Sequence, residues 1–119
     1  MAYVDGFLLP IPKKNLAVYR RMAKLASKVW REHGALEYRE CVGDDLAVKM
    51  VLPFTRVTKA KRGETVVFSW VVYKSRAHRD RVVAKVMKDP RLAKMAMPGG
   101  MPFDPKRMSY GGFKVIVEA

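Results

Sequence analysis

Hydrophobic and polar residues alternate along four segments of the chain, a period typical of β-strands with one buried face. The segments are 3–9, 36–42, 64–73 and 108–117. Pro10 and Pro12 are expected to end the first strand, because proline cannot donate a hydrogen bond to a sheet. The third segment, ETVVFSWVVY, is the richest in β-branched and aromatic residues and predicts the strongest strand.

Two other segments repeat their apolar residues every three or four positions, as amphipathic helices do. The first is 14–33, ended by Gly34, and the second is 76–88, opened by Ser75. Asp89–Pro90 predicts a short further helix to about Met97, and a loop is expected over 98–106. The stretch 46–62 predicts only an irregular excursion or an extra ribbon.

The order β-α-β-β-α-β predicts an α+β fold, a ferredoxin-like sandwich with the helices on one face of an antiparallel sheet. We expect one such domain over 1–119. Both faces of strand 64–73 are apolar: Val66, Phe68, Trp70 and Val72 point one way, and the intervening residues point the other way. Since two helices cover only one face, we expect the second face to pack against a second copy, in a homodimer.

The composition adds one unusual property, a net charge of +13. This charge permits contact with nucleic acid or anionic ligands, but a basic solvated surface explains it equally well. The single cysteine, Cys41, cannot form an internal disulfide, which fits a reducing cytoplasm. No apolar run is long enough to span a bilayer and the first residues lack signal-peptide features, so we expect a cytoplasmic protein without membrane contact.

Several long blocks of the sequence closely resemble the YbaA-like family of small bacterial proteins. The blocks are AYVDGFLLPIPKKN (2–15), WREHGALEYRECVGDD (30–45), VVFSWVVYKSRAHRDRVVAKVMKDPRL (66–92) and MPFDPKRMSYGGF (101–113). The resemblance implies the fold and dimer of the dimeric α/β-barrel superfamily. The YbaA-like family has no established function, so the resemblance implies no catalytic residues.

The final segment contains YGGFKV, which is similar to the RNA-stacking signature of RNA-recognition modules. In those modules the signature lies on the third strand, whereas here it lies on the fourth, so sheet-type RNA recognition is weakly supported. Gly111 and Gly112 have a simpler explanation, which is room for a bulky ring such as Trp30 or Trp70. The alternative is that the two glycines form the floor of a ligand pocket.

Three ionisable residues are candidates for catalysis. Asp5 lies in an apolar strand, where a buried carboxylate needs a partner such as Arg107 or serves as an acid or base. His33 ends the first helix and either interacts with its last carbonyls or exchanges protons at a pocket mouth. His78 lies among arginines in the second helix, which favours a neutral, hydrogen-bonding role. No spacing typical of a metal site is present, and we expect neither a metal nor a cofactor.

Two classes of function are consistent with these patterns, and enzymatic activity stays open. In the first, a small organic molecule binds between sheet and helices, with or without cofactor-free chemistry. The second is a basic dimeric module that binds RNA or another polyanion. The residues expected to bind a ligand are Tyr3, Trp30, Tyr38, Phe68, Trp70 and Tyr110, together with the catalytic candidates Asp5, His33 and His78.

Overall fold

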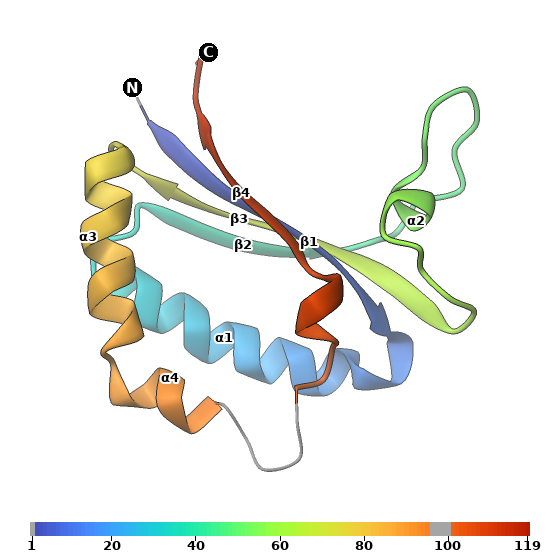
Figure 1. The fold of residues 1–119 in the computed structure, drawn as a ribbon, viewed down its shortest axis with the longest axis horizontal. Helices are drawn as coiled ribbons and strands as arrows, with labels where there is room; N and C mark the ends of the chain where they lie inside the picture. The colour runs from blue at the N-terminus through green and yellow to red at the C-terminus, as the bar shows by residue number, and fades with distance from the viewer. Residues whose placement is uncertain (1, 96–100) are drawn as a thin grey trace.

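The structure is a computed structural model, and it describes residues 2–95 and 101–119. Its strands are β1 (Tyr3–Pro12), β2 (Glu37–Val42), β3 (Glu64–Tyr73) and β4 (Ser109–Lys114). Its α-helices are α1 (Leu16–Glu32), α2 (Phe54–Val57), α3 (Arg76–Met87) and α4 (Pro90–Met95). Two 3₁₀ turns, η1 (Lys13–Asn15) and η2 (Pro105–Arg107), precede α1 and β4 (Figure 1).

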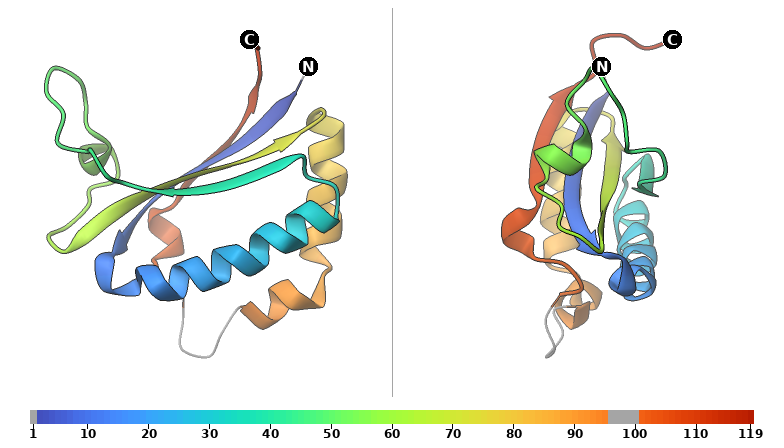
Figure 2. Two further views of the ribbon diagram at one scale, coloured as in Figure 1. Left: turned by 180° about the vertical axis from the view of Figure 1, so that it is seen from behind. Right: turned by 90° about the vertical axis from the view of Figure 1, so that its right-hand side faces the viewer.

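The four strands form one antiparallel sheet in the order β2-β3-β1-β4. Helices α1, α3 and α4 lie on the same face of this sheet, as the edge-on view in Figure 2 shows. The fold is therefore α+β with an open antiparallel sheet, as the sequence pattern predicts. The opposite face of the sheet, which we call the open face, carries no helix of the described chain except α2 near one end.

Strand β1 continues through both prolines, so the prediction that it ends there is wrong. Pro10 pairs with Val66 and Pro12 with Glu64 of β3, and the backbone N–H of Lys13 still donates to Gly63. Successive N–H groups of a strand point to opposite sides, so the N–H groups of odd-numbered residues here point toward β3. The nitrogens of Pro10 and Pro12 therefore point away from β3. No strand of the described residues pairs with β1 on that side, because β4 pairs only with 3–8. The missing N–H groups thus cost no sheet hydrogen bond.

The other element ends follow from partners and caps. Gly34 has a φ of +119° just beyond α1, and the Ser75 hydroxyl accepts the N–H of His78 at the start of α3. Strand β4 ends at Lys114 rather than at 117, because its partner strand begins at Tyr3. The predicted end of the short helix at Met97 and the first residues of the predicted loop 98–106 lie outside the described residues.

The core lies between the sheet and the helices, in two neighbouring clusters. The larger one packs Val71 and Tyr73 of β3 against Val29 of α1 and Val82 and Val86 of α3, all buried. The smaller one packs Leu9, Ile11 and Val67 beneath the start of α1. The two alternating sets of β3 lie on opposite faces, as predicted. Val66, Phe68, Trp70 and Val72 face away from these helices, so the expectation that Phe68 and Trp70 line a pocket between sheet and helices is wrong.

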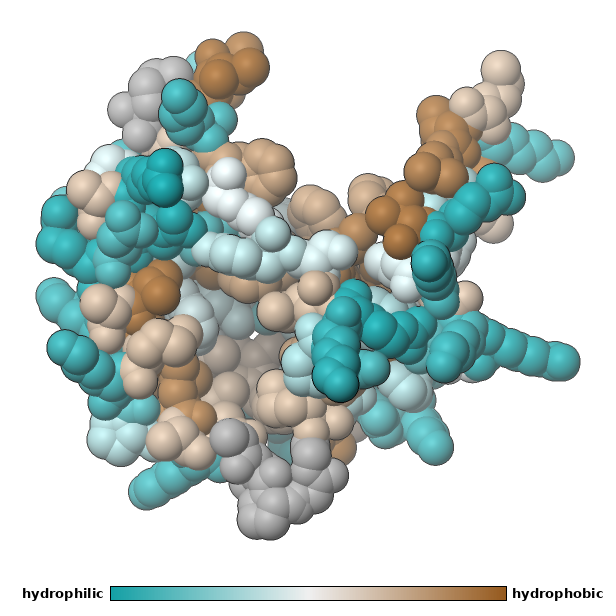
Figure 3. Space-filling model, viewed as in Figure 1, coloured by the Kyte–Doolittle hydropathy of each residue, from teal (hydrophilic) through white to brown (hydrophobic). Residues whose placement is uncertain are grey.

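Residues 43–63 leave the body of the molecule between β2 and β3, and we call this segment the arm (Figure 1). The expected irregular excursion is confirmed, with the single turn of α2 as its only helix. Apolar side chains project from it into solvent, and Met50 is fully exposed. The space-filling view shows them as a brown band along the projecting segment (Figure 3). Other exposed apolar residues of the arm are Val48, Val51, Leu52, Phe54 and Val57.

Candidate functional site

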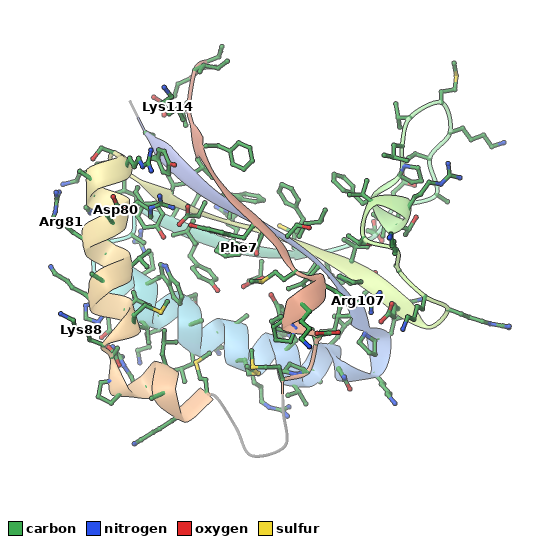
Figure 4. The ribbon with its side chains drawn as sticks, in the orientation of Figure 1. Phe7, Asp80, Arg81, Lys88, Arg107 and Lys114 are labelled. Carbon is green, nitrogen blue, oxygen red and sulfur yellow. The ribbon has the colours of Figure 1, made fainter. Side chains whose placement is uncertain are left out.

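A partly open cavity of about 200 Å³ lies between the sheet and α1, and residues of α4 and of the segment before β4 also line it. Its floor is a row of side chains across three strands, in which Phe7, Ser69 and Glu40 are direct neighbours in register. Figure 4 shows Phe7 at the centre of the sheet. The rest of the lining is almost entirely apolar: Leu9, Val71, Leu92, Met22, Met95, Met101, Phe103 and Met108, with Trp30, Tyr19 and Tyr38.

The cavity exists because α1 turns small residues toward the middle of the sheet. Ala23 and Ala26 lie at the centre of its inward stripe, whereas Tyr19 and Trp30 stand at either end of that stripe. Large rings at the ends hold the helix away from the sheet, and the two methyl groups between them do not fill the gap. Side-chain size along one helix face therefore shapes the cavity.

One carboxylate, that of Glu40, faces this apolar space, and two tyrosines hold it. The Tyr19 hydroxyl donates to Oε1 at 2.7 Å and the Tyr38 hydroxyl donates to Oε2 at 2.7 Å. Helix α1 supplies Tyr19, while Tyr38 and Glu40 are alternate residues of β2 and so share a face. Both carboxylate oxygens are thus fixed, and each retains a lone pair for a further donor.

Burial raises the pKa of both tyrosines well above its ordinary value of 10, and the negative charge of Glu40 raises it further. The two hydroxyls therefore stay protonated and act as donors to Glu40. Trp30 packs beside Tyr38, with ring centroids 5.9 Å apart, and its Nε1–H donates to the Tyr73 hydroxyl at 3.1 Å. No free N–H of Trp30 is left to point into the cavity.

Asp5 belongs to a second polar cluster, between β1, β4 and α3. Its buried carboxylate accepts from Arg79 Nη1 at 2.7 Å and from the Tyr110 hydroxyl at 3.0 Å. The Arg79 guanidinium also lies over the Tyr3 ring, 5.0 Å from its centroid. The expected partner Arg107 is wrong: it pairs with Glu64 at 2.8 Å, because its 3₁₀ turn lies beside the start of β3.

The two glycines of β4 serve ring packing, but the expected rings are wrong. A Cβ on Gly112 would lie 2.9 Å from the Tyr3 ring on the helix side, so this position requires glycine. Gly111 lies on the open face beneath Phe113. Neither Trp30 nor Trp70 is the neighbour, because register places β4 next to β1 and not next to β3.

The two histidines lie away from the cavity lining. His33 ends α1, and its Nε2 lies 2.8 Å from Asp89 Oδ2, at the junction of α1 with α4. His78 Nδ1 accepts the backbone N–H of Lys74 at 3.0 Å. Its pKa is lowered, first by desolvation and then by the charges of neighbouring lysines and Arg81, which agrees with the neutral role expected for it.

The predicted ligand-binding residues thus divide among three places. Trp30 and Tyr38 line the cavity, Tyr3 and Tyr110 join the Asp5 cluster, and Phe68 and Trp70 lie on the open face. The sequence reasoning missed Tyr19 and Glu40 as site residues and Arg79 as the partner of Asp5. The signal that could have identified Glu40 is a charged residue two positions after Tyr38, on the same face of a strand.

Within the described residues, the structure supports neither a metal site nor a membrane-spanning helix. Among residues 2–95 and 101–119, no three His, Cys, Asp or Glu side chains gather as metal ligands would. None of the helices in the part of the chain that the structure describes combines the length and hydrophobicity needed to cross a bilayer.

Fold and cavity together define a small α+β protein with one polar acceptor group in an apolar pocket. The family model described as "Protein of unknown function (DUF1428)" matches residues 2–105, and the chain belongs to this family. The chain is also 42% identical, over 118 residues and 99% of both sequences, to "Uncharacterized protein YbaA" of Escherichia coli (strain K12). The same protein of Shigella flexneri matches equally well. The resemblance stated from the sequence is thereby confirmed.

Among solved structures, the "De novo designed protein Foldit4" is similar with a TM-score of 0.50. The alignment covers 97% of this chain and 99% of the designed one, at 10% sequence identity. At this identity the similarity concerns the fold alone.

Proposed function

We propose that this protein binds a compact, largely apolar organic molecule in the cavity between the sheet and α1. The carrying observation is the Glu40 carboxylate, which two tyrosine hydroxyls hold inside an otherwise apolar lining. Ligand sites commonly combine mainly apolar and aromatic walls with a few fixed polar groups that orient the ligand. A purely structural core gains nothing from placing a carboxylate there, since even a half-buried charge loses part of its hydration.

The size of the cavity limits the ligand. An apolar cavity of about 150 Å³ is enough to bind benzene. The cavity here, about 200 Å³, suits a single ring or a branched chain of similar size that carries one polar group. A carboxylate fixed in this position is also a proton acceptor for a bound acid, so any enzymatic activity would begin at Glu40.

Binding is tested by titrating ¹⁵N-labelled protein with monocyclic aromatic probes and following amide shifts by NMR. We expect saturable shifts at residues around the cavity, such as Ala23, Ser69 and Leu92. The matched control is Ala26→Leu, which fills the space without adding a polar group. Filling a cavity is commonly neutral or stabilising, so this variant keeps the fold and loses binding. Equal binding by both proteins, or no saturable shift with any probe, would overturn the proposal.

We further propose that the fold is the ferredoxin-like sandwich and that two copies pack their open faces together in a dimeric α/β barrel. The sheet order and the single helical layer support the first part. The second part is supported by the apolar open face, on which Phe68 and Phe113 are 44% and 60% exposed, and by the apolar arm beside it. A stable dimer buries roughly 800 Å² per partner, more than one face of a small sheet offers alone, so the arm is expected to contribute.

The dimer is tested by sedimentation equilibrium of the unmodified chain and of Phe113→Lys. Phe113 lies on the outer strand with a largely exposed ring, so the lysine is expected to keep the fold and to weaken association. The exposed Val18→Lys on α1 is the control and is expected to leave the mass unchanged. A monomer for the unmodified chain at micromolar concentration argues against the barrel.

A second function, polyanion binding, is favoured by the outer face of α1. Arg20, Arg21, Lys24, Lys28 and Arg31 are all exposed there, and no carboxylate among the described residues lies within salt-bridge distance of them. Such a stripe binds phosphates without sequence preference, and its affinity falls steeply with salt. Fluorescence anisotropy with a labelled RNA, measured with increasing salt, tests it. An affinity unchanged by Lys24→Glu/Lys28→Glu would refute this role of α1.

A further inference from the structure

The ligand class of the cavity follows from what Glu40 lacks. The molecule carries 24 lysines and arginines. None of those in the described chain, nor either histidine, has a nitrogen within 4.0 Å of the Glu40 carboxylate. In most proteins a carboxylate in apolar surroundings pairs with a cation, because desolvation leaves its charge uncompensated. Here two neutral hydroxyls bind the half-buried carboxylate, and no cation of the described residues forms an ion pair with it.

We propose that the cavity binds an organic ammonium ion, whose charge Glu40 neutralises and whose apolar body fills the space beneath α1. This inference rests on the proposed ligand-binding function and names the class of molecule bound.

The hydrogen-bonding capacity of the site supports a donor ligand. Both tyrosine hydroxyls spend their protons on Glu40, and Trp30 spends its N–H on Tyr73. Burial and the Glu40 charge hold the tyrosine pKa values high, so both hydroxyls stay protonated and keep donating to the carboxylate. The polar groups that face the cavity therefore offer acceptors to a ligand, and only the Ser69 hydroxyl among those described also has a hydrogen to donate. An ammonium group donates without needing to accept.

The aromatic lining supports a positive charge on that donor. Tyr19 and Tyr38 hold the carboxylate, Phe103 is in edge contact with Tyr19 at 5.7 Å between centroids, and Trp30 lies beside Tyr38. Ring faces attract cations, most strongly where water is excluded. The polarizable sulfurs of the methionines in the wall also suit the apolar part of such a ligand. An organic anion, in contrast, would be repelled by Glu40.

Arg20 and Lys24 line a neighbouring groove that also includes Tyr19 and Glu40. They are exposed on the outer side of α1, while Tyr19 and Ala23 face inward on the same helix. Their flexible side chains are the alternative source of positive charge for Glu40. The experiment must therefore separate an ammonium ligand from an anion held by these two residues.

The experiment compares four probes of one shape at pH 7 by NMR titration: benzylamine, benzyl alcohol, toluene and benzoate. We expect benzylamine to bind about tenfold or more tightly than benzyl alcohol and toluene, since close charge pairs in shielded sites contribute at least this much. In Glu40→Gln, which keeps the shape and the acceptor oxygen, benzylamine is expected to lose this advantage. The Lys24→Ala control is expected to keep it.

Each other outcome has a distinct meaning. If toluene and benzyl alcohol bind as tightly as benzylamine and Ala26→Leu abolishes all three, the cavity binds ligands but the ammonium inference is wrong. If benzoate binds best and Lys24→Ala weakens it, the outer cations define the ligand and the inference is also wrong. If no probe binds, the proposed function fails together with it. Circular dichroism of Glu40→Gln confirms that the variant has folded.

Discussion

The ion pair between Asp5 and Arg79 gives the most demanding test of how β1, β4 and α3 hold together. Asp5 is only 2% exposed, and the Arg79 side chain is 14% exposed. In Arg79→Met the carboxylate stays buried and keeps the Tyr110 hydroxyl as a donor, but it loses its cation. Breaking a buried pair on one side costs about 3–5 kcal/mol, because the remaining charge is uncompensated. At roughly 4 °C per kcal/mol for a domain of this size, the midpoint of thermal unfolding falls by about 12–20 °C.

The double variant Asp5→Leu/Arg79→Met removes both charges and leaves none unpaired. It is expected to lose about 2 kcal/mol less than the sum of the two single variants. Urea unfolding followed by tryptophan fluorescence measures all three, and an unchanged m-value shows that the unfolded states are comparable. Arg81→Met, an exposed position on the same helix, is the control and is expected within about 0.5 kcal/mol of the original chain. Additive single losses below about 1 kcal/mol would refute the reasoning.

Three further changes test other contacts. Gly112→Ala places a methyl group 2.9 Å from the Tyr3 ring and is expected to lower the free energy of unfolding by about 1–3 kcal/mol in urea. Adding Tyr3→Val to this variant is expected to reduce the loss. No loss in Gly112→Ala would mean that the strand shifts freely. The Arg107 guanidinium lowers the pKa of Glu64 from its ordinary 4.5 to about 2, so the unfolded chain binds the proton first and stability falls as pH drops from 4.5 to 2. Glu64→Gln is expected to flatten this part of the stability profile, and an unchanged slope contradicts the pairing. Desolvation lowers the pKa of His78 below 6.5, so stability also falls as pH drops below 6.5, and His78→Gln removes that separate loss in a thermal-unfolding series from pH 8 to 5.

Periodicity was sufficient for the sheet and its helical layer. The alternation along β3 separated Val67 and Val71, which are buried beneath the helices, from Phe68 and Trp70 on the other face. The three- and four-residue period over 14–33 likewise predicted helix α1. These predictions succeed because burial of apolar surface acts on the same period as the backbone.

The partners of charged groups could not be predicted in the same way. Asp5 and Arg79 are 74 positions apart, and nothing local distinguishes Arg79 from the other arginines as its partner. The pairing depends on the angle at which α3 crosses the sheet, which is a property of the packed fold. The continuation of β1 through Pro10 and Pro12 has a similar origin, since a proline is tolerated only where the neighbouring strand is absent. Glu40 is a site residue because the packing of α1 brings Tyr19 within hydrogen-bond distance of its carboxylate, which the sequence alone does not show.

The arm connects the end of β2 to the start of β3, two strands that pair directly with each other. Gly43 donates its N–H to Val66, and Val42 pairs with Val67, so the chain leaves and rejoins the sheet at neighbouring points. Lengthening or shortening such an excursion changes the entropy of closing it only slowly, by about 0.6 kcal/mol for each doubling of its length. The cavity, on the far side of the sheet, takes none of its lining from the arm. The proposed association and the proposed ligand binding therefore depend on separate parts of the chain, and a change in the length of the arm would alter the first without altering the cavity lining beneath α1.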